Sequence, residues 1–153
     1  MNPIQIIRRE MTAVELARMR IGFDEHTIEQ NVAVQSADRF SFTAEANGQF
    51  VGCVSGLVYK NDDEYSGWSY LTDLFVEKEF RIQGLGRSLL RKWEADIREV
   101  GVKHVYTWTA GYEAPAFYRK QGYHIFTEME HWYSDGSSRV GLRKTLIPLL
   151  NIV

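Results

Sequence analysis

One segment in the second half of the chain constrains the fold more than any other. An apolar run at residues 68–76 predicts a strand, and the glycine-containing turn after it opens an amphipathic helix at about 85–100. The apolar residues of this helix recur with helical period, and Gly101 is a typical helix stop. A second strand is predicted at 103–109. Two strands joined through a helix are expected to pair in parallel, so the segment predicts a βαβ unit within a sheet.

The N-terminal third predicts one strand and two helices. We expect a short strand at 4–8 and a helix that starts at the capping-box pattern of Thr12. This helix should run to about Ile21 and stop at Gly22, before a second helix at 25–34.

The remaining segments predict two hairpins and a short helix. Strands at 40–46 and 49–60 flank Asn47-Gly48, a strong hairpin signal, and an acidic loop follows at 61–64. A short helix is expected at 113–121, followed by a last hairpin whose strands are 123–133 and 139–146. The predicted order, β-α-α-β-β-β-α-β-α-β-β, is that of a mixed α/β fold in one domain over residues 1–153.

The turn between the predicted strand and helix has the composition of an anion-binding site. Its sequence is Arg81-Ile82-Gln83-Gly84-Leu85-Gly86-Arg87-Ser88. The first N–H groups of a helix have no partner within it, and the helix dipole adds positive potential there. Glycines at 84 and 86 allow phosphate oxygens to approach without a Cβ in the way.

Spacing argues against two nucleotide-binding loops. A Walker loop needs four residues between its glycines and a Gly-Lys-Ser/Thr end, whereas one residue separates Gly84 from Gly86 and Arg87 takes the place of the lysine. A dinucleotide fingerprint needs a third glycine, which this turn does not have.

A third reading fits. Arg81-x-x-Gly84-x-Gly86 after an apolar strand resembles the signature of the GNAT acetyltransferase family. The segment Ala114-Pro115-Ala116-Phe117-Tyr118-Arg119-Lys120-Gln121-Gly122-Tyr123 resembles the second signature of that family. The resemblance implies an α/β fold with a mixed, mostly antiparallel sheet, a central splayed pair of parallel strands, and flanking helices.

The resemblance also implies a binding mode for acetyl-coenzyme A as cosubstrate. The turn formed by Arg81, Ile82, Gln83, Gly84, Leu85, Gly86, Arg87 and Ser88 would hold the pyrophosphate. The pantetheine arm would pair with the end of the preceding strand at Leu74, Phe75 and Val76, where the strand splays from its parallel neighbour. One backbone N–H there would stabilise the oxyanion of the thioester carbonyl.

Two residues are candidates for the chemistry. The resemblance gives Tyr118 the role of general acid for the leaving thiolate; the alternative is a tyrosine packed in the core. Asp73 lies inside an apolar run, where an unpaired carboxylate would be costly to bury, so it should have a partner or a catalytic role. A buried structural carboxylate bonded to backbone N–H groups remains the alternative for Asp73.

The sequence departs from the family pattern at the positions that often carry a base. Tyr70, Thr72 and Tyr106 stand where members of the family carry glutamate, and Gly111 stands where many carry an asparagine. Water relayed to backbone or to a tyrosine hydroxyl therefore stays open as the route for the proton. Glu25, His26, Trp68, Tyr70, Trp108 and His131 could line the acceptor cleft, although ordinary core or surface roles are commoner for such residues.

Composition limits the partners. The formal net charge of −2 favours neither nucleic acid nor an anionic membrane. The single cysteine, Cys53, precludes an intramolecular disulfide and fits a cytoplasmic protein, and the four histidines lack metal-ligand spacing. The apolar tail at 147–153 would be explained by burial in the core or by a homodimer contact.

The sequence therefore predicts an N-acetyltransferase that moves acetyl from acetyl-coenzyme A to a primary amine by direct attack in a ternary complex. The alternative is a non-catalytic acyl-coenzyme A-binding regulatory module.

Overall fold

The computed structural model describes residues 2–146, which divide after Val34 into two compact units. The predicted tail at 147–153 lies outside the described residues. The N-terminal unit contains one helix, α1 (Ala13–Glu29), which begins with the predicted capping box. The Glu15 N–H donates to Thr12 Oγ1 at 3.2 Å, and the Thr12 N–H donates to the Glu15 carboxylate at 2.8 Å.

Two predictions for the N-terminal unit are wrong. Gly22 does not stop the first helix, because a glycine inside a helix weakens it by only about 1 kcal/mol and does not break its hydrogen bonds. The two expected helices are therefore one, which ends near Asn31 in the left-handed conformation. The segment 4–8 forms no strand. Its isoleucines are exposed and no described strand pairs with it, and a strand needs a partner for its backbone groups.

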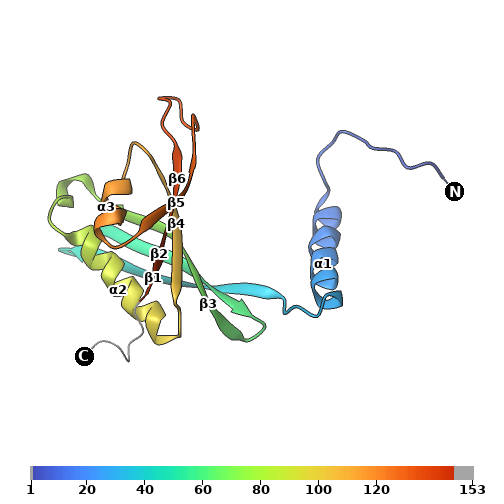
Figure 1. The fold of residues 1–153 in the computed structure, drawn as a ribbon, viewed down its shortest axis with the longest axis horizontal. Helices are drawn as coiled ribbons and strands as arrows, with labels where there is room; N and C mark the ends of the chain where they lie inside the picture. The colour runs from blue at the N-terminus through green and yellow to red at the C-terminus, as the bar shows by residue number, and fades with distance from the viewer. Residues whose placement is uncertain (1, 147–153) are drawn as a thin grey trace. The chain divides into compact units, whose positions relative to one another are not determined.

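The second unit is a six-stranded sheet with the order β1-β2-β3-β4-β6-β5 (Figure 1). Among the strands of residues 2–146, only β3 and β4 pair in parallel, so the mixed, mostly antiparallel sheet is confirmed. Its elements are β1 (Gln35–Ala46), β2 (Gln49–Asn61), β3 (Glu64–Val76), the short 3-10 helix η1 (Lys78–Phe80), α2 (Leu85–Glu99), β4 (His104–Ala110), α3 (Pro115–Lys120), β5 (His124–Met129) and β6 (Arg139–Thr145).

The turns follow the sequence signals with two differences. Asn47 and Gly48 both have positive φ, 50° and 74°, as a tight two-residue hairpin turn requires. The acidic loop expected at 61–64 is shorter, because Asn61 already pairs with Glu64 and only two residues turn. The last hairpin has a longer loop than predicted, since β5 ends at Met129.

β3 and β4 separate halfway along their length, which confirms the predicted splay. They pair from Trp68–His104 to Leu71–Thr107 and no further, while β4 continues to pair with β6 up to Ala110. At the same point the register of β3 against β2 shifts, with Gly56 opposite Leu71 and Ser55 opposite Asp73. This bulge bends β3 away and leaves its β4-facing edge without a strand partner after Leu71.

Helix α2 covers one face of the sheet over β1, β2 and β3 (Figure 1). Trp93 is fully buried there, and a Cβ on Gly56 would collide with its ring and with the Tyr70 carbonyl. Glu94, also on α2, is buried and accepts from Lys144 Nζ at 2.8 Å and from the Tyr123 hydroxyl at 3.0 Å. This pair ties α2 to the β5–β6 side of the sheet. None of the helices within residues 2–146 is both long and apolar enough to span a membrane.

Candidate active site

The predicted anion-binding turn lies between η1 and α2. Gly84 is the N-cap of α2 with φ of 80°, and Ile82 also has a positive φ of 67°. A positive φ is a genuine outlier for a β-branched residue, and such strain concentrates at functional sites. The Ser88 N–H donates to the Gly84 carbonyl at 3.0 Å. The first turn of α2 before Ser88 therefore presents its N–H groups toward the loop.

A cavity of about 420 Å³ opens beside this turn. It is lined by Leu74, Val76, Phe80, Arg81, Ile82, Gly84, Leu85, Gly86, Arg87, Ala114, Phe117 and Tyr118. Eight of the residues predicted to bind the cosubstrate are in this set. The other three are placed differently: Phe75 stacks on Phe50, the Gln83 side chain donates to the Glu79 carbonyl at 3.4 Å, and Ser88 is inside the helix. We call this space the first cavity.

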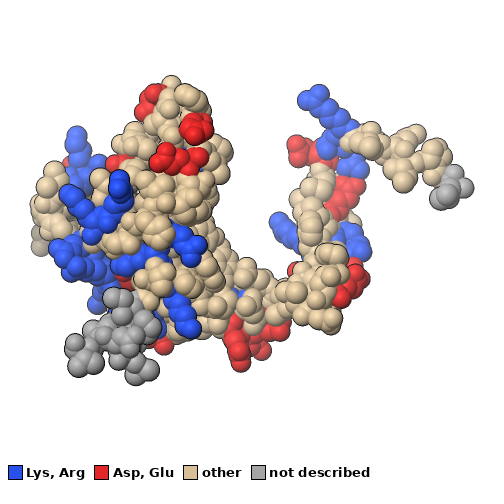
Figure 2. All heavy atoms as spheres, in the orientation of Figure 1, with Lys and Arg blue, Asp and Glu red and all other residues tan. Residues whose placement is uncertain are grey.

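The charge around the first cavity is positive. Arg81 Nε donates to the Val76 carbonyl at 2.9 Å, which fixes the guanidinium at the end of β3. Lys and Arg side chains gather over α2 and α3 (Figure 2). The basic residues of these two helices are Arg87, Arg91, Lys92, Arg98, Arg119 and Lys120. A small anion with several phosphates would meet favourable potential on this side of the unit.

A second cavity of about 230 Å³ lies where β3 and β4 have separated. Its walls are Thr72, Asp73, Leu74, Phe75, Thr107, Trp108, Thr109, Glu113, Ala114 and Tyr118. Leu74, Ala114 and Tyr118 line both cavities, so these three residues form the boundary between them. Of the residues suggested for an acceptor wall, Trp108 lines the second cavity. Trp68 instead packs against His104 with the two rings tilted by 31°, and Tyr70 stacks on Tyr106.

Tyr118 is buried, with 7% of its surface exposed. Its ring makes edge contacts with Phe117 and Tyr123. Burial raises the pKa of Tyr118 to about 12, an effect that the Thr107 side chain partly opposes. The Tyr118 hydroxyl is therefore protonated at neutral pH and can donate a hydrogen bond.

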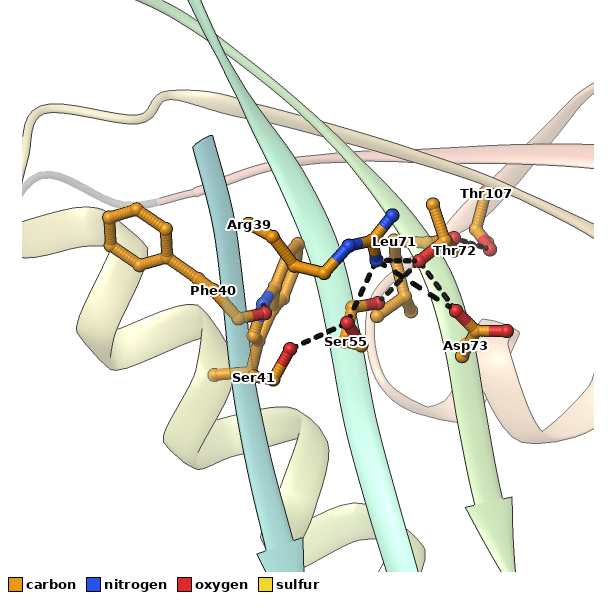
Figure 3. Close-up of polar contacts among 9 residues, drawn as sticks. Arg39, Phe40, Ser41, Ser55, Leu71, Thr72, Asp73 and Thr107 are labelled. Carbon is orange, nitrogen blue, oxygen red and sulfur yellow. Dashed lines mark hydrogen bonds and ion pairs between the residues drawn. The ribbon is translucent and has the colours of Figure 1, made fainter. Parts of the chain in front are cut away.

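The expectation that Asp73 is buried is wrong. The residue is exposed rather than buried in the apolar run, because the bulge turns its side chain away from the core. Thr72 Oγ1 lies 2.7 Å from Asp73 Oδ2, and Arg39 Nη1 lies 4.0 Å from the same oxygen (Figure 3). Asp73 therefore has a polar partner, and the cost of burial gives no argument for its role.

Sequence reasoning missed two charged residues near this site. Glu113 precedes the second signature directly and lines the second cavity. Arg39, on β1, reaches across the sheet to Ser55 Oγ and Thr72 Oγ1, both at 2.9 Å. The position of Glu113 beside the signature was a usable signal; nothing in the sequence around Arg39 indicated its contacts. Glu25 and His26 belong to α1 in the N-terminal unit.

Comparison with known proteins agrees with this architecture. The family described as the acetyltransferase (GNAT) domain matches residues 37–125, more than half of the chain. An uncharacterized N-acetyltransferase of Chlorobaculum tepidum is 33% identical over 82 residues, which are 54% of this chain and 48% of that protein. The chain thus spans about half the length of the curated relative it matches.

Solved structures share the fold. An acetyltransferase from Bacillus cereus superposes with a TM-score of 0.76 at 22% identity, covering 92% of this chain and 98% of that one. An aminoglycoside 6'-N-acetyltransferase solved with coenzyme A gives a TM-score of 0.59 at 20% identity, covering 72% and 74% of the two chains. From the domain match together with the fold, this chain belongs to the GNAT acetyltransferase family.

Proposed function

We propose that the protein transfers an acetyl group from acetyl-coenzyme A to a primary amine by direct attack in a ternary complex. One observation carries this proposal: two cavities meet at Leu74, Ala114 and Tyr118, where β3 and β4 separate. The cavity beside the basic turn suits the donor, and the cavity between the strands suits the acceptor. A thioester at their boundary would be reachable from both sides.

The donor is held in two places. The pyrophosphate meets the N–H groups at the start of α2 and the arginines at 81 and 87, a setting that favours anions. The amides of the pantetheine arm pair with the edge of β3 at residues 74–76, where none of the described strands pairs with β3 on the side of β4. A hydrogen bond from that edge to the thioester carbonyl would strengthen as negative charge develops on its oxygen.

The reaction forms a C–N bond and breaks a C–S bond. The neutral amine attacks the thioester carbon, the tetrahedral intermediate collapses as the thiolate leaves, and the proton that the positively charged nitrogen then loses passes through water to the thiolate. The Tyr118 hydroxyl donates a hydrogen bond to that sulfur. Because the Tyr118 pKa of about 12 lies above the thiol value of about 8.5, complete proton transfer to the thiolate is uphill. Tyr118 thus acts mainly by stabilising the developing charge.

The acceptor must lose a proton before it attacks, since an aliphatic ammonium has a pKa of about 10.4. Asp73 lines the acceptor cavity and accepts this proton through a water molecule. Its carboxylate is held by Thr72 rather than by a buried ion pair, which leaves it accessible to water.

The proposal is tested by following thiol release from acetyl-coenzyme A with and without a panel of primary amines, alongside calorimetric titration of acetyl-coenzyme A. Turnover that depends on an amine and gives intersecting reciprocal plots supports direct transfer. Binding of acetyl-coenzyme A without turnover on any amine would instead identify a non-catalytic acyl-coenzyme A-binding module. Parallel reciprocal plots would contradict direct attack, because they indicate an acetyl-enzyme.

A further inference from the structure

Two buried hydroxyl groups cross between β3 and β4, one near each end of their parallel pairing. Ser69 Oγ donates to the His104 carbonyl at 3.0 Å. Thr107 Oγ1 donates to the Leu71 carbonyl at 2.9 Å (Figure 3). Ser69 is fully buried, and Thr107 is 2% exposed. The two bonds therefore have the same structural effect, since each ties a side chain of one strand to the backbone of the other.

The surroundings of these two hydroxyls differ. Ser69 lines neither cavity, whereas Thr107 lines the second cavity together with Tyr118, at the last pair before the strands separate. Hydrogen bonding by the Thr107 side chain partly opposes the burial that raises the pKa of Tyr118 to about 12. Of the two hydroxyls, the one at the point of separation is therefore placed to act on the Tyr118 phenol.

The rings packed against Tyr118 do not supply such a group. Phe117 meets the Tyr118 ring edge-on and has no polar side-chain atom. Tyr123 also contacts this ring, but its hydroxyl already donates to a buried carboxylate on α2 at 3.0 Å. Thr107 is thus the one of these three neighbours that can donate a hydrogen bond to the phenol oxygen.

The direction of the Thr107 hydroxyl decides where the Tyr118 proton points. A threonine hydroxyl has one proton and two lone pairs. While Thr107 donates to the Leu71 carbonyl, its oxygen offers only lone pairs, which attract the phenol proton toward Thr107. When the hydroxyl rotates to donate to the phenol oxygen, the phenol proton turns away and is free for another acceptor. This donation strengthens as the phenol takes on negative charge, because linked hydrogen bonds polarise one another in a buried site.

We propose that Thr107 is a positioning residue that acts through Tyr118, its hydroxyl donating to the phenol oxygen while the phenol donates to the departing sulfur. The Leu71 carbonyl accepts the Thr107 hydrogen bond again between turnovers. Both hydroxyls keep their protons, so this step exchanges hydrogen bonds and breaks no covalent bond. The inference rests on the proposed function, in which Tyr118 stabilises the leaving thiolate.

The test compares variants that remove or keep the hydroxyl. Thr107→Val keeps the branched shape, and it should lower kcat about tenfold, the size expected for a hydrogen bond to a charged group. Calorimetry should show an unchanged affinity for acetyl-coenzyme A. Thr107→Ser keeps the hydroxyl and should keep most of the wild-type kcat. Ser69→Ala is the matched control, because it removes a buried hydroxyl bonded to the neighbouring strand, and its kcat should not change.

A double-variant cycle separates a role through Tyr118 from a purely structural one. In a Tyr118→Phe background, Thr107→Val should lower kcat little further, because the phenol oxygen on which Thr107 acts is gone. A structural disturbance would instead lower kcat by the same factor in both backgrounds. Urea denaturation should give similar losses of stability for Thr107→Val and Ser69→Ala, since each removes one hydrogen bond between β3 and β4.

Three results would overturn the inference and leave the proposed function standing. These are a wild-type kcat in Thr107→Val, an equal loss in both backgrounds, and a Thr107→Ser variant as slow as Thr107→Val. If Thr107→Val does not fold, Thr107→Ala takes its place in the same cycle, because a smaller side chain beside a cavity does not crowd the strands. Binding of acetyl-coenzyme A by the wild type without transfer to any amine would overturn both the inference and the proposed function.

Discussion

The two cavities of the second unit are built in different ways. The first takes seven of its twelve wall residues from one continuous segment, residues 80–87, and its anion-binding groups are largely backbone N–H groups at a helix start. The second takes its walls from β3, β4, the connection before α3 and Tyr118 of α3, and its polar groups are side chains. A site made of backbone groups depends on the local conformation of the chain, and glycines in the sequence indicate that conformation. A side-chain site depends on which strands become neighbours, and it can change its ligand without changing the fold.

The largest expected effect comes from breaking the buried ion pair between Glu94 and Lys144, which joins α2 to β6. Lys144→Met leaves the Glu94 carboxylate, whose side chain is only 3% exposed, without its cation. Breaking one partner of a buried pair should lower the free energy of unfolding by about 3 kcal/mol. Urea denaturation measures the loss, and Lys103→Met, at an exposed site, is the control. A loss below 1 kcal/mol would show that the pair contributes little to docking α2 on the sheet.

Tyr118→Phe acts at the boundary of the two cavities and so tests whether they cooperate. We expect kcat to fall by about 100-fold, with little change in the affinity for acetyl-coenzyme A, because the hydroxyl is used on the leaving sulfur. Steady-state thiol release gives kcat, and calorimetry gives the affinity. Tyr123→Phe is the matched control, since its hydroxyl bonds to Glu94. Wild-type turnover in Tyr118→Phe at all pH values would exclude the assigned role.

The pH dependence of stability follows from the same burial. The pKa of Tyr118 is raised from 10 in the unfolded chain to about 12 in the folded one, so the folded state holds this proton more tightly. The resulting stabilisation is complete below pH 10 and is lost as the pH rises from 10 through about 12. Denaturation midpoints measured across this interval should fall less steeply in Tyr118→Phe than in the wild type. An identical slope would mean that Tyr118 ionises in the folded state as freely as in the unfolded one.

Gly86→Val tests whether the first cavity can be changed without affecting the second. A Cβ at Gly86 would make only ordinary contacts, with the Phe117 ring at 3.7 Å and with Val76 at 3.8 Å, so the fold should tolerate a side chain there. The larger side chain would fill space beside the helix start and weaken acetyl-coenzyme A binding by about tenfold, or ~1.4 kcal/mol. The Michaelis constant for the amine, at saturating acetyl-coenzyme A, should not change. Equal losses on both sides would show that the two cavities are not independent.

The same contrast explains what could be predicted from the sequence. The strands, α2 and the hairpin at Asn47-Gly48 follow from periodicity and turn residues, which are local. The isoleucines at 4–8 looked like a strand because periodicity does not say whether a partner strand exists. Asp73 was expected to be buried because its neighbours are apolar, and a bulge, which depends on the pairing of β2 with β3, exposes it. Arg39 on β1 approaches Asp73 on β3 across the intervening strand β2, a contact that only the folded sheet creates.

The smallest effect concerns strain in the basic turn. Ile82 is fully exposed and has φ of 67°, a conformation that costs a side chain with a Cβ about 1–2 kcal/mol. Ile82→Gly removes this conformational cost from the folded state. Glycine also gives the unfolded chain more freedom, which reduces the gain in stability by ~0.5–1 kcal/mol. The net gain in stability should be about 0.5–1 kcal/mol, measured by urea denaturation, while Ile82→Val keeps the β-branch and should show none. A stabilised variant that binds acetyl-coenzyme A more weakly would mean that the strained turn is preorganised for the phosphate. If Ile82→Gly lowered the free energy of unfolding, the turn would not be strained at this position. The basic turn would then differ from the second cavity only in binding its ligand through backbone groups rather than side chains.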